Sequence, residues 1–164
     1  MRIANLLALA TFSGLTTAAA VSGRAITSRR PTKLWYRLLR KPKQTPPDWV
    51  FGVVWPALYA LTAYSGYRVF KHRSEPAAKT ALALWGAQLL FNASWTPLFF
   101  GKKRARAALG VLALNFVSLA AYALRARKVD RPAAAAVVPH LGWLAFASTI
   151  NAGVIRRNNG MFRG

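Results

Sequence analysis

Amide and indole side chains recur between residues 85 and 99 at intervals of three and four, which places them on one face of an α-helix. The set is Trp85, Gln88, Asn92, Trp95 and Phe99. Amides are costly in an apolar surrounding unless they meet partners, so we expect Gln88 and Asn92 to point into a helix bundle. This face suits either a hydrogen-bonded packing seam or one wall of a pocket for a flat ligand.

A second face of this kind is predicted from Trp143, Ala147, Ile150 and Asn151. Small Ala147 beside Trp143 leaves room for a flat ligand or for close helix packing. Asn115, together with Gln88 and Asn151, is expected to form a polar seam inside the bundle.

His140 is a candidate ligand of haem iron, since imidazole binds iron in many haem proteins. A single imidazole with no second ligand in view is more often a hydrogen-bonded residue of the core. We therefore predict no metal site and no obligatory cofactor.

No catalytic residues are predicted. The acids Asp48, Glu75 and Asp130 all lie in loops or at helix ends, which argues against a proton-driven pump and against acid–base hydrolysis. Phosphate-binding glycine loops and nucleophile elbows are absent from the sequence, and there is no cysteine for a thiolate site.

Five apolar stretches without Lys, Arg, Asp or Glu must position these residues: 3–21, 49–67, 80–100, 107–124 and 133–155. Each is close to the roughly 20 residues that cross a bilayer. We predict transmembrane helices at 3–21, 49–70, 80–100, 105–124 and 133–155, in one all-α integral membrane domain over residues 1–164. The net charge of +21 sits in the connections, and because no soluble core remains, we expect membrane lipids and no nucleic acid as partners.

The first stretch has an alternative interpretation. Arg2, the apolar run and Ala18-Ala19-Ala20 also resemble a secretory signal peptide with a small-residue cleavage site. Its apolar run is longer than the usual signal core, which favours a retained helix.

Charge predicts the orientation, because cytoplasmic loops retain Lys and Arg. The first loop, the third loop and the tail hold 15 of the 24 basic residues, so we expect the C-terminus to face the cytoplasm.

The first loop, 22–48, is the longest connection. Apolar and basic residues alternate at helical spacing over 33–40, which predicts a short amphipathic helix at the interface or over the mouth of the bundle. Pro42, Pro46 and Pro47 then keep the chain extended. A helix is expected to begin near Asp48 or Trp49, with the carboxylate of Asp48 available to cap it.

Several segments together resemble the translocator protein family, also called the TspO/MBR family or tryptophan-rich sensory proteins. The resemblance runs from the first span to about Gly160. It rests on Trp35-Tyr36 with Lys41-Pro42, on Pro46-Pro47-Asp48-Trp49 through Trp55, on Gln88, Asn92 and Trp95 through Gly101, and on Pro139-His140-Leu141-Gly142-Trp143 leading to Asn151.

The resemblance implies a five-helix bundle, commonly dimeric, in which the first loop covers a pocket that binds porphyrins. Ala83 and Ala87 have the spacing of a close helix–helix contact and agree with a homodimer. Carried over position by position, the pocket residues are Trp49, Val50, Gly52, Val53, Asn92, Trp95, Trp143, Ala147 and Ile150.

On the loop, Trp35 would cover the pocket, and Arg37, Arg40 and Lys41 would pair with propionates of a porphyrin or haem. The expected function is a membrane receptor or transporter for planar, apolar, anionic ligands in tetrapyrrole homeostasis or stress regulation. The family implies two alternatives, a light-dependent porphyrin-degrading enzyme and a sterol- or lipid-binding protein; Ala152 replaces the Tyr that the sterol motif of vertebrate members needs. A bacterial envelope and a mitochondrial outer membrane both suit the sequence.

Overall fold

The computed structural model describes residues 2–162; within the first helix it describes the side chains at 7, 10–18, 21 and 25–27. All regular secondary structure in residues 2–162 is helical, which confirms the all-α prediction. The elements are α1 (Arg2–Thr27), α2 (Arg30–Leu38), α3 (Asp48–Phe70), α4 (Pro76–Thr96), a π-helical turn (Pro97–Gly101), α5 (Ala105–Val129), α6 (Arg131–Ala136), α7 (Val138–Arg157) and a 3-10 turn (Asn159–Phe162).

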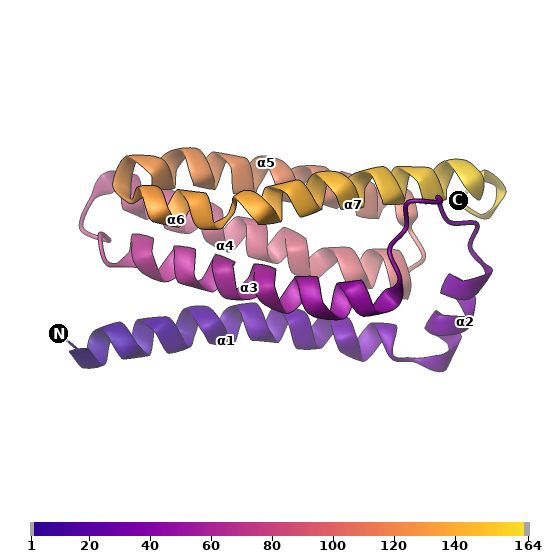
Figure 1. The fold of residues 1–164 in the computed structure, drawn as a ribbon, viewed down its shortest axis with the longest axis horizontal. Coiled ribbons are helices and arrows are strands. Elements are labelled where there is room, and N and C mark those ends of the chain that lie inside the picture. The colour runs from indigo at the N-terminus through magenta and orange to yellow at the C-terminus, as the bar shows by residue number, and fades with distance from the viewer. Residues whose placement is uncertain (1, 163–164) are drawn as a thin grey trace.

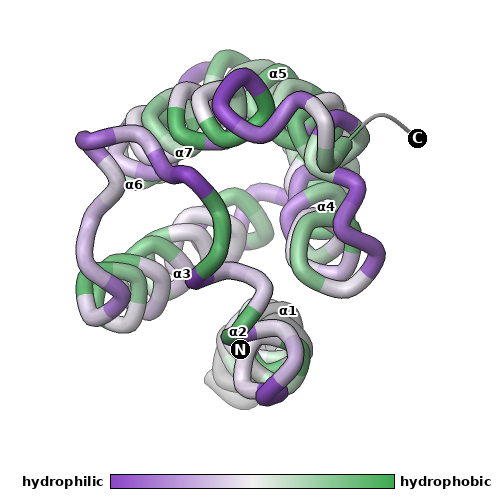
Figure 2. The backbone as a smooth tube through the Cα atoms, turned by 90° about the vertical axis from the view of Figure 1, so that its right-hand side faces the viewer, coloured by the Kyte–Doolittle hydropathy of each residue, from purple (hydrophilic) through white to green (hydrophobic). Residues whose placement is uncertain are grey.

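The long helices lie side by side in a bundle and α2 crosses one end of it (Figure 1). Seen end-on, α5, α6 and α7 form one side, α3 and α4 lie next to them, and α1 lies on the opposite side (Figure 2). α4 packs along α5, α5 along α7, and α1 against α3 and α4. The first loop, the α4–α5 connection and the end of α7 therefore meet at the same end as α2.

α1 packs into the core through Phe12. The ring of Phe12 lies 4.7 Å from the ring of Trp85 and 5.7 Å from that of Phe70. Gly66 makes this approach possible, since a Cβ there would lie 2.7 Å from Cδ1 of Phe12. α1 continues to Thr27, so the connection predicted over 22–48 is shorter than expected.

Prolines mark where helices start. Pro31, Pro76, Pro132 and Pro139 stand at the first or second position of α2, α4, α6 and α7, where a missing N–H costs no helical hydrogen bond. The predicted fifth span, 133–155, is accordingly divided: α6 ends at Ala136 and α7 begins at Val138, just before Pro139.

The prediction that Asp48 caps α3 is wrong. Pro47 occupies the N-cap position with an extended backbone, and α3 has no side-chain cap. Asp48 is instead the first helical residue, where its carboxylate is still favoured by the positive end of the helix dipole.

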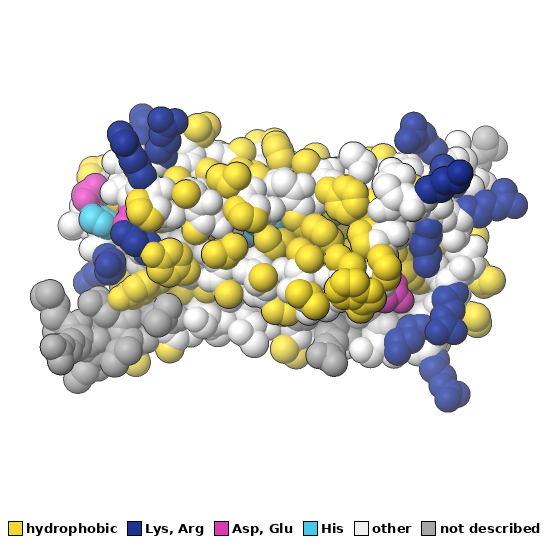
Figure 3. All heavy atoms as spheres, viewed as in Figure 1, with side chains coloured by type: hydrophobic (Ala, Val, Ile, Leu, Met, Phe, Trp, Pro, Cys, Tyr) yellow, Lys and Arg dark blue, Asp and Glu magenta, His cyan; other side chains and the backbone are white. Residues whose placement is uncertain are grey.

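Lys and Arg side chains gather at the two ends of the bundle, with apolar side chains between them (Figure 3). By length and composition, two segments of the described range are apolar enough to cross a membrane, Ala105–Val129 and the α6–α7 pair, Arg131–Arg157. Which of the helices cross a membrane stays a prediction.

Candidate functional site

A chain of buried hydrogen bonds joins α3, α4 and α7. The hydroxyl of Tyr59 donates to Oδ1 of Asn92 (3.1 Å), and Nδ2 of Asn92 donates to Nε2 of His140 (3.1 Å). On the other side of the imidazole, Nδ1 lies 3.0 Å from Oγ1 of Thr62, whose hydroxyl donates to the carbonyl of Leu58. This order of donors requires a neutral His140 that carries its proton on Nδ1. Both ring nitrogens are therefore engaged, and neither has a lone pair free for iron.

Aromatic rings fill the seam between α3 and α7 beside this chain. The ring of Trp55 stacks on Tyr59 with centroids 5.5 Å apart, and meets His140 and Trp143 edge-on at 5.9 and 6.3 Å. Phe51 contacts Trp143 at 5.6 Å. The rings of two helices thus form one continuous aromatic surface next to a polar core.

Trp95 belongs to a second aromatic group, at the α2 end of α4. It stacks on Phe99 with centroids 5.1 Å apart and an angle of 16° between the planes, and it lies 5.7 Å from Phe100. Phe99 and Phe100 belong to the π-helical turn that begins at Pro97. Trp95 stands one turn beyond Asn92 on the same helix, so α4 links the two groups.

Seven buried polar atoms in this interior have no hydrogen-bond partner. They come from α4, α5 and α7, the helices that carry the predicted seam and pocket. The atoms are both amide atoms of Gln88, both amide atoms of Asn151, Oδ1 of Asn115, and the indole nitrogens of Trp95 and Trp143. An unsatisfied buried donor or acceptor costs about 1–3 kcal/mol. These atoms make the interior of the bundle polar at several points on three helices.

The predicted pocket residues fall into two groups in the structure. Buried or half-buried inside the bundle are Val50, Asn92, Trp95, Trp143, Ala147 and Ile150. Trp49, Gly52 and Val53 are exposed, Trp49 to 70% and Val53 to 63%, and lie on the outer face of α3. The structure connects Asn92 to Trp143 through His140 and Trp55, and does not bring Trp49 into this group.

The first loop is fastened over the end of the bundle. Trp35 of α2 is 9% exposed, and its ring lies 5.7 Å from Phe99 and 6.4 Å from Phe162. Leu34 and Leu38 of the same helix are 62% and 69% exposed. We call residues 28–47, which contain α2, the lid.

Of the predicted cations of the lid, Arg37 and Arg40 are exposed. Lys41 places its Nζ 3.8 Å from the centre of the Tyr36 ring, a cation–π contact. Burial, with a smaller contribution from Asp48, raises the pKa of Tyr36 to about 12, so the ring remains neutral beside Lys41.

Sequence reasoning missed the contribution of α3 to the polar chain. Phe51, Trp55, Tyr59 and Thr62 follow one another at intervals of four, four and three, and so share the inner face of α3. Trp49, Gly52 and Val53 belong to the outer face. The same helical periodicity that identified the polar face of α4 would have distinguished the inner face of α3 from its outer face.

The sequence is similar to known proteins over most of its length. A model of the TspO/MBR family matches residues 7–157. The chain is 39% identical to the human translocator protein, over 77% of this chain and 76% of the relative. It is 38% identical to the tryptophan-rich sensory protein of Cereibacter sphaeroides, over 76% of this chain and 77% of the relative. It is 30% identical to the tryptophan-rich protein TspO of Chlorobaculum tepidum, over 94% and 98%.

Proposed function

We propose that this protein, which belongs to the TspO/MBR family, binds a planar, apolar, anionic ligand of the porphyrin class between α3, α4 and α7. Proteins of this family are membrane proteins, and relatives named as translocator and sensory proteins support a receptor-like role in the membrane.

The observation that carries the proposal is the pair of unpartnered indole nitrogens of Trp95 and Trp143. Each N–H is a donor buried beside aromatic rings: Trp95 stacks on Phe99, and Trp143 meets Phe51 edge-on. A porphyrin has a large π face and polar groups at its nitrogens and carboxylates. It would satisfy these donors and stack on these rings at the same time.

Within this proposal the two groups of pocket residues have different roles. Asn92, Trp95, Trp143, Ala147, Ile150 and Val50 line the pocket, and the exposed Trp49, Gly52 and Val53 form its outer rim. Gln88, Asn115 and Asn151 supply further hydrogen-bonding groups from the interior. The lid would supply the countercharge for the carboxylates of the ligand through Arg37, Arg40 and Lys41.

We further propose that α1, α3, α4, α5 and the α6–α7 pair cross the bilayer, with the lid and the C-terminus in the cytoplasm. Large apolar side chains are exposed along the middle of these helices, where hydrocarbon would cover them. They are Leu15, Leu90, Leu114, Val117 and Val138.

Titration of the purified protein with protoporphyrin IX, followed by tryptophan fluorescence, tests the ligand class. We expect saturable quenching at micromolar ligand. Trp143→Phe keeps an aromatic ring but removes the N–H, so its dissociation constant should rise about tenfold, the equivalent of one hydrogen bond.

Trp49→Phe is the matched variant, because it removes an indole at the rim and should weaken binding less. Absence of saturable quenching would contradict the porphyrin class. Equal dissociation constants for the wild type and Trp143→Phe would contradict the position of the pocket.

A further inference from the structure

Four cations crowd the corner where α5 ends and α6 begins, at the end of the bundle opposite the lid. They are Arg125, Arg127, Lys128 and Arg131, and with Leu124 they line an open hollow of about 820 Å³. Figure 3 shows Lys and Arg side chains gathered at this end. We call these five residues the basic corner.

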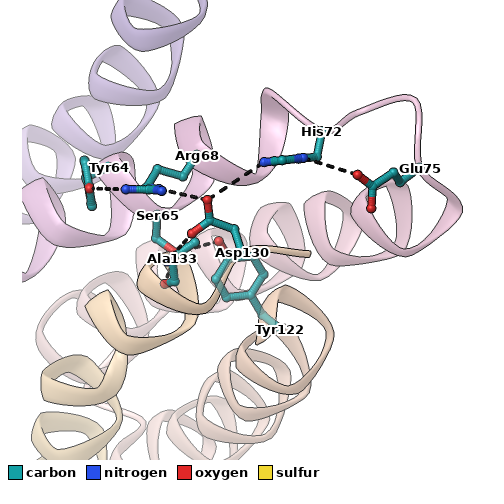
Figure 4. Close-up of polar contacts among 8 residues, drawn as sticks. All are labelled: Tyr64, Ser65, Arg68, His72, Glu75, Tyr122, Asp130 and Ala133. Atoms are coloured by element: carbon teal, nitrogen blue, oxygen red, sulfur yellow. Dashed lines mark hydrogen bonds and ion pairs between the residues drawn. The ribbon is translucent and has the colours of Figure 1, made fainter. Parts of the chain in front are cut away.

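The acid nearest in sequence does not neutralise the basic corner. Oδ2 of Asp130 accepts a hydrogen bond from Nε of Arg68 at 2.9 Å and lies 3.9 Å from Nε2 of His72 (Figure 4). Its Oδ1 accepts from the backbone N–H of Ala133 and caps α6. Both oxygens are thus committed, and the side chain is 5% exposed.

Glu75 also lies elsewhere, against His72 at 3.2 Å. Within residues 2–162, no carboxylate lies within ion-pair distance of the four cations of the basic corner.

Two ordinary explanations account for little of this arrangement. The negative end of the α5 dipole favours cations, but it is worth about half an elementary charge. The tendency of cytoplasmic loops to be rich in Lys and Arg does not explain these cations, because the proposed topology places the basic corner on the non-cytoplasmic side of the membrane. Four like charges close together repel one another, and a bound anion would relieve this repulsion.

An apolar stripe leads to the basic corner along the outer face of α5. Leu114, Val117 and Leu124 are 52%, 64% and 66% exposed. Their spacing of three and seven places them in one line, and Lys128 continues that line one turn further. A ligand that fits both parts is anionic at one end and has a long apolar chain.

We propose that the basic corner binds the phosphate headgroup of an anionic phospholipid, whose acyl chain lies along the Leu114, Val117 and Leu124 stripe. The proposal goes beyond porphyrin binding, and it rests on the proposed topology, in which α5 spans the bilayer and the basic corner lies on the side opposite the lid. Arg side chains bind phosphate oxygens in pairs, and basic sites at the ends of transmembrane helices attract anionic headgroups.

Native mass spectrometry of the detergent-solubilised protein tests the site. The protein is incubated with equal amounts of phosphatidylglycerol and phosphatidylcholine that carry the same acyl chains. We expect the wild type to retain at least about tenfold more phosphatidylglycerol. The variant R125Q/R127Q/K128Q should bring this ratio close to one.

The matched control is K71Q/R73Q/K79Q, which removes three exposed cations from the same end of the bundle but outside the basic corner. It should keep the wild-type ratio. An equal loss in both variants would overturn the proposal, since it would show only the general attraction of a basic protein for anionic lipid. Tryptophan emission and elution volume confirm that each variant is folded. R125K/R127K keeps the charge but loses the paired guanidinium donors, so it should retain more phosphatidylglycerol than R125Q/R127Q/K128Q and less than the wild type.

A second experiment distinguishes binding of a phospholipid from binding of free phosphate. Leu124→Asn interrupts the apolar stripe and keeps every cation, so it should lower phosphatidylglycerol retention several-fold. Glycerol 3-phosphate and inorganic phosphate should compete poorly. Effective competition by either anion, with full retention by Leu124→Asn, would show a phosphate site without a lipid and overturn the assignment.

Discussion

Asn158 holds both backbone polar groups of Arg40. Its Oδ1 accepts from the Arg40 N–H at 3.0 Å and its Nδ2 donates to the Arg40 carbonyl at 2.9 Å, across 118 residues of sequence. The same Nδ2 also donates to the carbonyl of Val154, so Asn158 extends the end of α7 into the lid. This amide is the polar counterpart of the Trp35 contacts that hold α2.

Asn158→Ala should release the lid. The substitution leaves the N–H and the carbonyl of Arg40 without these partners, which costs about 1–3 kcal/mol. We expect this to destabilise the closed position of the lid and not the packing of the whole bundle. Hydrogen exchange of residues 33–47 should accelerate about tenfold or more, while exchange in α4 and α5 stays unchanged. Asn159→Ala is the control, because the neighbouring amide of Asn159 accepts from Arg106 of α5 instead. Equal acceleration in both variants would contradict the role of Asn158.

Gly153→Ala should displace the lid by sterics. A Cβ on Gly153 would overlap the ring of Pro42, which is buried against α7. We expect a lower melting temperature and faster exchange around Pro42, since the proline ring has little freedom to yield.

Gly142→Ala, on the same helix, is the control, and we expect it to raise the stability that Gly153→Ala lowers. Nothing lies within 4 Å of a Cβ at Gly142, so alanine there should stabilise α7 by about 0.5–1 kcal/mol. A stabilising effect of Gly153→Ala would show that the lid does not pack on α7 as the structure has it.

The proposed topology can be tested by cysteine labelling, because the chain has no cysteine of its own. Ser28→Cys and Gly160→Cys lie at the lid end of the bundle and Ser74→Cys at the other, all three in exposed positions. When the protein is expressed in the inner membrane of bacterial cells, a membrane-impermeant maleimide should label Ser74→Cys alone in intact cells and all three variants in permeabilised cells. Labelling of Ser28→Cys and Ser74→Cys from the same side would contradict a crossing by α3.

The positions of α1, α3, α4, α5 and α7 were predictable because each lies in a long apolar stretch bounded by charges or prolines. The exceptions are local. Pro97 begins a π-helical turn, and the break at Val137 divides the last span, since a proline removes one helical hydrogen bond and the neighbouring turn must adjust.

The partners of His140 could not be predicted in the same way. The sequence places this imidazole alone in its span, whereas Tyr59, Thr62 and Asn92 reach it or its amide partner from two other helices. Which faces meet depends on the rotation of each helix about its axis. That rotation is determined by packing contacts such as Phe12 against Trp85, which a single sequence does not specify.

Gln88 and Asn92, one turn apart on α4, should respond in opposite ways to the loss of their amides. Asn92 bonds to Tyr59 and His140, so Asn92→Leu leaves two buried groups without partners and should destabilise the protein by about 2–4 kcal/mol. The amide of Gln88 has no partner in the interior and is fully buried. Gln88→Met keeps the size of the side chain and removes this unsatisfied group, so the ligand-free protein should be equally or more stable.

Porphyrin affinity completes the comparison. If the Gln88 amide serves the ligand, Gln88→Met should weaken protoporphyrin IX binding about tenfold while the melting temperature of the ligand-free protein holds or rises. Thermal melts of both variants, recorded with and without the ligand, measure both quantities in one experiment. A loss of stability in Gln88→Met with unchanged affinity would mean that Gln88 serves the packing of the bundle, and the polar interior would then be a structural seam rather than a binding site.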